Sequence, residues 1–333
     1  KQGEFEVCSP RECAQLDHVS FQGFKYPDAA ARQELTDMLD ILYQSDAKPE
    51  DVERRLKIIG IELAGLLPKD IVDLLRLSKI KSVMLRHEDD FDFPLELVYL
   101  DDARDPFFVG DRKAICRWYM GVTNLPDIIN KRIERMAFVK GTHAAAETDE
   151  AYLRTMFGNR FQTVASTSEI VTNVFRKTDF DAIQFTGHCL REANAGGGLE
   201  LANGDILQVI EVGQLMEERA FGGKNPFIVL NACASAKPYQ GLMQRNSFVH
   251  RFINSQACAV VGTLWPVEVN VANQFTSLFY EKLQKLPIGQ ALIATKQSIA
   301  NDNTKDEDER RARQVAVRSY CLFANPDLRL STQ

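Results

Sequence analysis

Two short hydrophobic runs in the second half of the chain each lead to a chemically reactive residue. The run from Asp181 to Phe185 leads to His188, and the run from Phe227 to Leu230 leads to Cys233. Apolar runs that end in small or polar residues are typical of strands buried on both faces of a parallel sheet. Open α/β sheets place their ligand sites along the carboxyl ends of such strands. Because neighbouring strands lie about 4.8 Å apart, the pattern predicts that the imidazole of His188 and the thiol of Cys233 face each other.

Hydrophobic periodicity over the rest of the chain alternates between strand and helix patterns. Strands are predicted at residues 80–86, 107–109, 113–118, 135–140, 161–165, 181–185, 227–230, 258–262 and 319–323. Helices are predicted at residues 28–44, 49–66, 68–77, 148–157, 168–177, 213–221, 247–255, 270–286 and 288–300. Asn203-Gly204 is a strong hairpin-turn signal, and the charged stretch 301–313 is expected to be a solvated helix end or loop. The alternation predicts an α/β fold with a parallel-dominated sheet.

The composition limits the classes of function. The 333 residues are 45% apolar and 26% charged, as in a soluble globular protein. A net charge of −6 argues against direct binding to a nucleic-acid backbone. No apolar run approaches the roughly 20 residues of a membrane span. Seven cysteines, an odd number without Cys-x-x-Cys spacing, favour free thiols in a reducing cytoplasm. No signal peptide is visible, and a start at Lys1 rather than Met leads us to expect a processed or excised piece of a longer chain.

A cysteine with a histidine in reach is the minimum equipment of a thiol nucleophile. The alternative interpretation is that Cys233 is a small core residue at a strand end and that His188 is a satisfied structural residue. Small residues flank both positions, and they favour a site because they leave room for a substrate backbone.

Other chemical motifs do not fit the sequence. The run Gly222-Gly223-Lys224 lacks the first glycine of a P-loop, and a phosphatase loop would need arginine where Tyr239 stands. His188 and Cys189 could join Cys233 around a metal ion, but the usual ligand spacing is absent, so we expect no metal. The remaining histidines have no evident partners in the sequence and are expected to be surface or structural residues: His18, His87, His143 and His250.

Six motifs occur in an order and at a spacing that together resemble one known family. They are Phe93-Pro94-Leu95-Glu96-Leu97, Phe185-Thr186-Gly187-His188, Leu230-Asn231-Ala232-Cys233-Ala234-Ser235, Val260-Val261-Gly262-Thr263-Leu264-Trp265-Pro266-Val267-Glu268, Phe279-Tyr280 and Asn325-Pro326-Asp327-Leu328-Arg329-Leu330. From about Arg55 to Leu330 the chain resembles the CHAT domain, a caspase-like branch of the clan CD cysteine peptidases.

The resemblance implies a fold and a division of the chain. It implies a caspase-like, parallel-dominated sheet flanked by helices and preceded by a degenerate N-terminal subdomain that lacks the dyad. We therefore expect an N-terminal segment of unknown role at residues 1–50, a degenerate caspase-like subdomain at 51–130 and the CHAT catalytic domain at 131–333.

The resemblance also implies roles for particular residues. His188 and Cys233 would form the catalytic dyad, and the backbone N–H groups of Cys233 and Cys189 would bind the oxyanion. Family members often carry glycine where this chain has Cys189, so the room beside that backbone is smaller here. Trp265 and Glu268 are expected to line the pocket for the substrate residue before the cut, although Glu268 could instead cap the helix that follows. No metal or organic cofactor is implied.

The resulting hypothesis is a cysteine endopeptidase that cleaves a protein substrate. CHAT domains commonly act as triggered effectors in bacterial defence or cell death, so a sensor or activator protein or domain is the expected partner. Two alternatives stay open: a catalytically inactive caspase-like scaffold that binds a regulatory partner, and a different thiol enzyme such as an acyltransferase. Residues 194–198 and 235–246 flank the predicted site and are expected to gate it.

Overall fold

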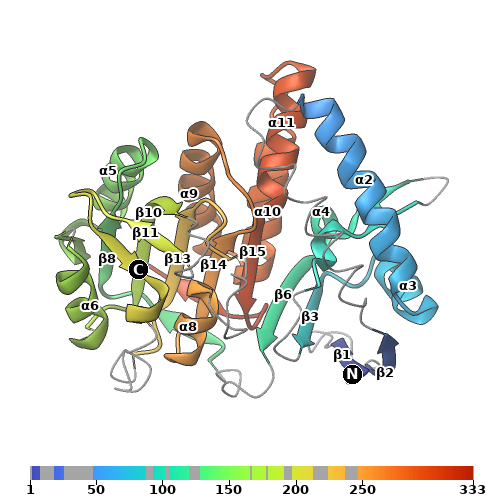
Figure 1. Ribbon diagram of the computed structural model, residues 1–333, viewed down its shortest axis with the longest axis horizontal. Coiled ribbons are helices and arrows are strands. Elements are labelled where there is room, and N and C mark those ends of the chain that lie inside the picture. Colours follow the sequence, from blue (N-terminus) through green and yellow to red (C-terminus); the bar gives the residue numbers. More distant parts are fainter. Residues whose placement is uncertain are drawn as a thin grey trace.

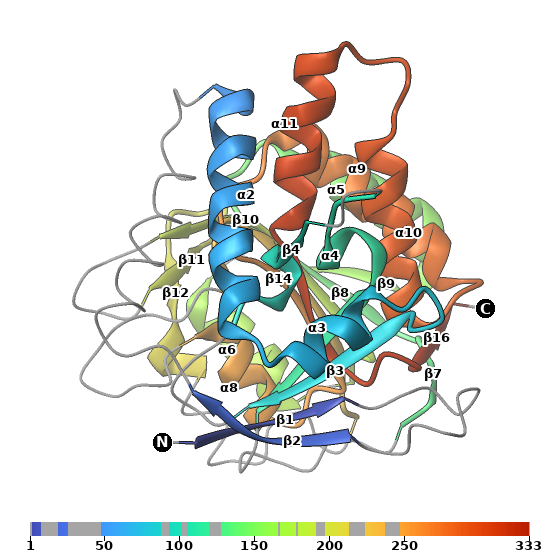
Figure 2. The ribbon, with the colours of Figure 1, turned by 90° about the vertical axis from the view of Figure 1, so that its right-hand side faces the viewer.

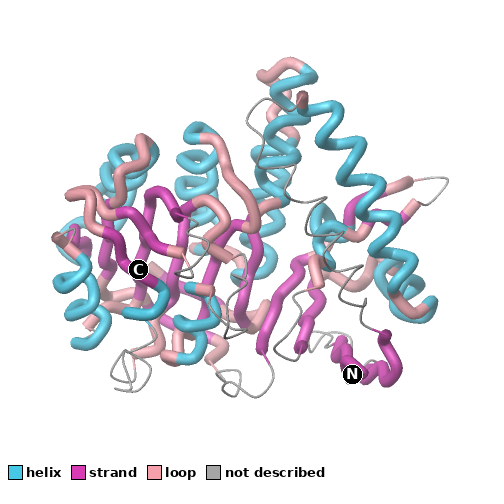
Figure 3. Tube along the Cα trace, viewed as in Figure 1, coloured by secondary structure: helices cyan, strands magenta, loops and turns pink. Residues whose placement is uncertain are grey.

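A computed structural model provides the fold of the chain (Figure 1). It describes residues 2–7, 19–25, 48–87, 93–101, 105–119, 128–165, 167–177, 179–190, 197–212, 224–236 and 247–332. A single large sheet lies in the middle of the molecule, with helices on both sides of it (Figure 3).

The central sheet has ten strands, most of them parallel to their neighbours. Its main path runs β12 (Ile206–Gln208), β11 (Gly198–Glu200), β10 (Ala182–Leu190), β13 (Phe227–Ala232), β14 (Ala259–Thr263), β15 (Tyr320–Ala324), β6 (Ala114–Tyr119) and β3 (Ser82–His87). A branch at β10 adds β8 (Met136–Lys140) and then β9 (Phe161–Val164). Strands β11 and β12 are antiparallel additions, and β14 and β15 are antiparallel to each other. The sheet confirms the predicted α/β class.

Strand β10 is the branch point because it is longer than its neighbours. Its first part pairs with β13 on one side and with β8 on the other. Its last three residues, from His188 to Leu190, extend beyond β8 and pair with β11 instead. The end of β10 is therefore held in a ladder, while the neighbouring strand β13 stops at Ala232 and enters a turn.

Smaller pairs of strands lie outside the central sheet. They are β1 (Gln2–Val7) with β2 (Val19–Lys25), β4 (Tyr99–Leu100) with β5 (Phe107–Phe108), and β7 (Asn130–Arg132) with β16 (Arg329–Ser331). The last of these pairs joins segments about 200 residues apart in the sequence, close to the end of the described chain.

Helices cover both faces of the sheet, as Figures 1 and 2 show from two directions. One face carries α5 (Ala145–Phe157), α9 (Val269–Leu283) and α10 (Ile288–Ala300), and the other carries α6 (Ser168–Lys177) and α8 (Phe248–Asn254). The ring of Phe227 in β13 lies 6.3 Å from the rings of both Phe279 and Tyr280 in α9. On the opposite side, the rings of Phe175 in α6 and Phe252 in α8 are 5.4 Å apart. Large aromatic side chains therefore fill both layers of the core.

A second hydrophobic cluster lies under α2 (Pro49–Leu66) and α3 (Lys69–Arg76). Its side chains include Leu56, Ile59 and Leu63, which are fully buried and recur at helical spacing on one face of α2. Figure 2 shows α2 beside α11 (Glu307–Arg318), so a helix from the first fifth of the sequence packs against one near its end.

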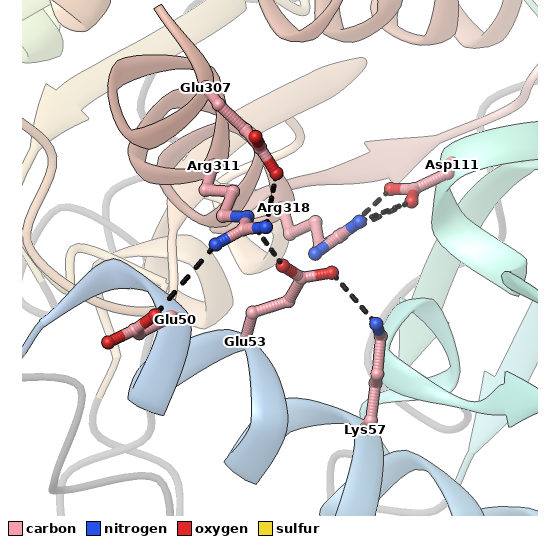
Figure 4. A network of polar contacts seen from close by, with 7 residues as sticks. All are labelled: Glu50, Glu53, Lys57, Asp111, Glu307, Arg311 and Arg318. Atoms are coloured by element: carbon pink, nitrogen blue, oxygen red, sulfur yellow. Dashed lines mark hydrogen bonds and ion pairs between the residues drawn. The ribbon is translucent and has the colours of Figure 1, made fainter.

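Polar contacts join α2 to α11 (Figure 4). Arg311 of α11 reaches Glu53 of α2 at 3.8 Å and forms an ion pair with Glu307 on its own helix. At the other end of α11, Arg318 donates three hydrogen bonds to the carboxylate of Asp111 in α4 (Val109–Arg112), the shortest of 2.7 Å. Two short 3₁₀ segments, η2 (Leu95–Leu97) and η3 (Gly158–Arg160), complete the described elements.

The helices predicted at residues 49–66 and 168–177 have those same bounds as α2 and α6. The predicted helices at 28–44 and 213–221 lie outside the described residues. The charged stretch expected to be a helix end or loop contributes the first turns of α11. The division of the chain at residues 50 and 130 stays a prediction. Among the helices of the described ranges, none is long and apolar enough to cross a membrane.

Candidate active site

His188 and Cys233 lie at the ends of neighbouring parallel strands. The ladder between β10 and β13 runs in register from Ala182 opposite Phe227 to Gly187 opposite Ala232. His188 and Cys233 are the next residue on each strand, at the carboxyl edge of the sheet. The His188 side chain is exposed, and Cys233 is partly buried.

Hydrogen bonds to β13 and β14 hold the turn that carries Cys233. Ala234 has a φ of 54°, a left-handed conformation that costs a non-glycine residue about 1–2 kcal/mol. The Ser235 hydroxyl donates to the carbonyl of Leu230 (3.0 Å) and accepts the N–H of Thr263 (3.1 Å). The Thr263 hydroxyl in turn donates to the carbonyl of Ala232 (2.6 Å). These bonds from β14 fix the sharp bend immediately after Cys233.

The thiol of Cys233 has an environment that keeps it protonated at rest. Burial raises its pKa above the ordinary value, and a backbone hydrogen bond from Val267 opposes part of that rise. A thiol with a raised pKa is a poor nucleophile until a base removes its proton. Any chemistry at Cys233 therefore needs a proton acceptor, and His188 is the imidazole at the end of the adjacent strand.

A second histidine contacts the first. The ring of His143, in the loop between β8 and α5, lies 4.7 Å from the ring of His188 at an interplanar angle of 80°. His143 Nδ1 accepts the N–H of Ala145 at 3.2 Å, which fixes its ring. Burial lowers the pKa of His143, and the neighbouring charge of His188 lowers it further. The expectation that His143 has no partner is wrong.

The loop that carries His143 can reach His188 only because two glycines meet beneath it. A Cβ at Gly141 would lie 2.6 Å from the Cα of Gly187, closer than atoms can pack. The N–H of Gly141 donates to the carbonyl of Thr186 (2.8 Å), so the loop is hydrogen-bonded to β10. Next to it, the Thr142 hydroxyl donates to Glu200 of β11 (2.8 Å).

A buried carboxylate contacts β10 and β13 two residues before His188 and Cys233. Asp149 of α5 is 1% exposed, and its Oδ2 accepts hydrogen bonds from four side chains on three elements. The donors are Gln184 (3.1 Å) and Thr186 (2.8 Å) of β10, Asn231 (3.0 Å) of β13 and Thr276 (2.9 Å) of α9. Burial raises the pKa of Asp149 to about 6, and the four bonds oppose that rise.

Sequence reasoning missed both His143 and Asp149. His143 follows the predicted strand 135–140 by three residues, which places it at the same sheet edge as His188, and this signal was available. Asp149 gave no such signal, since an acidic residue near the start of a helix is ordinarily solvated and favourable there.

The other predicted site residues are placed as follows. Cys189 lies in the ladder between β10 and β11, opposite Leu199. Trp265 is 2% exposed and packs in the cluster under α2, so in this conformation its ring offers no open wall to a substrate. Glu268 is exposed and occupies the N-cap position of α9, but its side chain makes no capping hydrogen bond. Pocket lining by Trp265 and Glu268, and the oxyanion role of the Cys189 backbone, stay predictions.

Within the described ranges, no group of three His, Cys, Asp or Glu side chains could hold a metal ion. Of the two predicted gating loops, residues 194–196 and 237–246 lie outside those ranges.

The comparisons with known proteins agree with the arrangement of the strands. The family model of the CHAT domain matches residues 87–321. The chain belongs to the CHAT family. The search of curated proteins finds no match.

Solved structures with a similar fold are caspase-like peptidases of clan CD. A complex of the pro- and mature domains of RgpB from Porphyromonas gingivalis aligns with a TM-score of 0.52 at 11% identity, over 90% of this chain and 78% of that one. The Saccharomyces cerevisiae separase–securin complex aligns with a TM-score of 0.47 at 12% identity, over 68% of this chain and 15% of that one. At this identity the likeness to RgpB shows the fold alone, which is caspase-like as expected.

Proposed function

We propose that this CHAT protein is a cysteine endopeptidase that cleaves a protein substrate with Cys233 and His188. The observation that carries the proposal is their position, one residue beyond the last registered pair of two parallel strands. Support also comes from the fixed, left-handed turn after Cys233, since strained backbone of this kind clusters at active sites.

The reaction would proceed by acyl transfer. The proton of the Cys233 thiol passes to His188, and the sulfur attacks the carbonyl carbon of the scissile peptide bond. The tetrahedral oxyanion accepts hydrogen bonds from backbone N–H groups, for which Cys233 and Cys189 are the candidates; one such donor is worth about 3 kcal/mol in other enzymes. His188 then protonates the leaving amine as the C–N bond breaks, and water hydrolyses the thioester to free the new carboxyl terminus.

The residue before the cut is proposed to be basic or apolar. Glu268 is exposed one residue after Val267, whose backbone bonds to the Cys233 thiol. A carboxylate in the segment that borders the nucleophile would favour Arg or Lys from the substrate, whereas an apolar pocket would select Met or Leu. A peptide library assayed on wild type and Glu268→Gln separates the two: a basic preference that survives the substitution excludes Glu268 as the selector.

The proposal extends to a biological setting. By its membership of the CHAT family, we propose that the protein is a triggered effector in bacterial defence or cell death, controlled by a sensor or activator protein or domain. The raised pKa of the Cys233 thiol suits such control, because a protonated thiol is unreactive until the site is completed.

The experiment that tests the function is mapping of cut sites. The protein is incubated with proteins encoded beside its gene, and new N-termini are identified by mass spectrometry for wild type and for Cys233→Ala. New termini that appear only with wild type support an endopeptidase. Their absence, with modified substrate lysines or thiols in their place, would favour acyl transfer. If neither appears but a partner binds both proteins equally, the chain is an inactive scaffold.

A further inference from the structure

Among the described residues, no positively charged side chain bonds to the buried carboxylate of Asp149. Its Oδ2 is bonded to the amides of Gln184 and Asn231 and the hydroxyls of Thr186 and Thr276, and its Oδ1 accepts the amide of Asn273 (3.1 Å) in the orientation that satisfies that side chain; all of these are neutral groups. Its charge also raises the pKa of two buried phenols, those of Tyr280 and Tyr320. Burying a carboxylate without a cation is costly, and the raised pKa of Asp149 reflects that cost.

A purely structural tie between these elements would not need the charge. Replacing buried charged groups by neutral ones of similar volume is often neutral or stabilising for the fold. Hydrogen bonds to a charged acceptor are, however, shorter and about twice as strong as those to a neutral one. A carboxylate at this place therefore sacrifices stability and holds its four donors more firmly.

Of the three donors on the sheet, Thr186 and Asn231 are the ones nearest to His188 and Cys233 along their strands. Thr186 and Asn231 lie directly opposite each other in the ladder between β10 and β13. Each precedes its candidate catalytic residue by two positions; alternation along β10 places Thr186 on the same face as His188, and Cys233 follows directly after the end of β13. One oxygen atom of Asp149 thus links the two strands through Thr186 and Asn231, two residues before the proposed dyad.

The bridge extends beyond the pair of strands. Asn231 also donates to the carbonyl of Ala272 in α9 (3.2 Å), and its Oδ1 accepts the hydroxyl of Tyr320 in β15 (2.8 Å). The end of β13 is therefore fixed relative to α5, α9 and β15 at once. Catalytic groups must be held to about 0.5 Å to be productive, and the contacts of Asp149 add to the ladder with β11 that holds the end of β10.

We infer that ionised Asp149 is a positioning residue: it locks the ends of β10 and β13 in register so that His188 faces Cys233. The inference rests on the proposed dyad. Asp149 touches neither the substrate nor the reacting atoms, so its loss should lower kcat and the reactivity of Cys233 while leaving KM little changed.

The test compares Asp149→Asn and Thr276→Val with a matched control, Thr295→Val. An Asn at position 149 can keep an oxygen facing the four donors but has no charge. Thr276→Val removes one donor to Asp149 from α9, and with it a hydroxyl that accepts from Gln184 (3.3 Å) and Asn231 (3.1 Å). Thr295, whose buried hydroxyl donates to Ala291 within α10, loses the same kind of bond away from β10 and β13. Folding of each variant is checked by its melting temperature.

The first readout is the rate at which iodoacetamide alkylates Cys233, measured by mass spectrometry from pH 5 to pH 9; it needs no substrate. We expect Asp149→Asn to lower the His188-dependent part of this rate about tenfold, since misplacement of about 1 Å can cost up to a hundredfold in rate. Thr276→Val should give a smaller loss, and Thr295→Val none. The rate of wild type relative to that of Asp149→Asn, compared at the same pH, should rise as the pH passes through about 6, where Asp149 ionises in wild type.

The outcomes separate the inference from the function. If Cys233 reacts in a His188-dependent way and Asp149→Asn matches wild type at every pH, Asp149 is structural and the inference fails alone. If alkylation of Cys233 does not depend on His188, the proposed dyad fails first. A folded Asp149→Asn variant whose cleavage shows a raised KM at unchanged kcat would also overturn a positioning role.

Discussion

The region around β6 and the region around β10 and β13 bury charged groups in different ways. In the region around β6, the fully buried Arg117 donates to both carboxylate oxygens of Glu96, which is 2% exposed. In the region around β10 and β13, Asp149 of α5 is as deeply buried, but it bonds only to amides and hydroxyls. The charges of the first pair cancel, whereas the charge of Asp149 is uncompensated.

The difference separates groups that serve the fold from groups that serve the site. The ion pair of Arg117 and Glu96 joins β6 to the segment before β4 and closes the cluster under α2. Ionisable groups with strongly shifted pKa values concentrate at functional sites, and Asp149 lies directly beneath the ends of β10 and β13. The same fold thus uses buried charge for architecture on one side and for positioning on the other.

The largest effects are expected at the proposed dyad. Cys233→Ala and His188→Ala should each lower the cleavage rate by about a thousandfold or more, and the double variant should be no worse, since members of a catalytic unit are not additive. Both side chains lie at the open edge of the sheet, so the melting temperature should hardly change. The rates are measured on the substrate that cut-site mapping identifies. Losses that add up in the double variant would contradict a unit.

Breaking the ion pair should affect stability and leave the site intact. Glu96→Gln removes the negative charge that pairs with the buried Arg117 and should lower the free energy of unfolding by about 3–5 kcal/mol. The double variant Glu96→Leu/Arg117→Met removes both charges and should recover most of that loss. Urea denaturation measures both. A loss below about 1 kcal/mol, the range of exposed ion pairs, would show that the pair is not a buried structural one.

Trp265 is expected to belong to the structural side of the comparison. Trp265→Ala should lower the free energy of unfolding by about 3 kcal/mol or more, because it leaves a cavity in the cluster under α2. Denaturation together with a peptide library checks this. A variant of wild-type stability with altered preference for the residue before the cut would return Trp265 to the substrate pocket.

The ionisation of Asp149 should appear in the pH dependence of stability. Its pKa is raised to about 6 in the folded protein and is about 3.9 in the unfolded chain, so the folded state binds this proton more tightly. The stabilising effect of the proton is full below about pH 4 and is lost as the pH rises through about 6. Wild type should therefore lose roughly 2–3 kcal/mol relative to Asp149→Asn across this window. Parallel stability curves for the two proteins would contradict the shift.

The smallest effect is expected at His143. His143→Ala removes the ring that lies against His188 and should lower kcat by about tenfold or less, as a small displacement of a catalytic group does. His143→Phe keeps a ring in place and should retain more activity than the alanine variant. Steady-state kinetics of the two variants measures the difference, and equal rates for Ala, Phe and wild type would exclude any role in holding His188.

The sequence was sufficient for most elements and for placing His188 and Cys233 at the ends of two neighbouring strands. Apolar runs that end at His188 and Cys233 predicted neighbouring strands, because continuous hydrophobicity reports burial on both faces of a sheet. Helical spacing predicted α2 and α6 to the residue. These features depend on local periodicity, which a sequence displays directly.

Features that depend on tertiary packing could not be predicted. Asp149 looks like an ordinary acidic residue in the first turns of a helix, and only the docking of α5 on β10 and α9 buries it. Trp265 looks like a pocket wall because it follows a strand of the sheet, yet it turns into the cluster under α2. In both cases a distant segment decides the environment of the side chain.

The central claim is that His188 activates the thiol of Cys233, and covalent labelling by a peptide chloromethyl ketone tests it most directly. The rate of labelling is measured by intact-protein mass spectrometry on wild type and His188→Ala, with the modified residue mapped after digestion. The account predicts one label per chain, on Cys233 and not on Cys189, formed at least about a hundredfold faster in wild type, as expected for a general base. Equal rates in the two proteins, or a label on another cysteine, would contradict it.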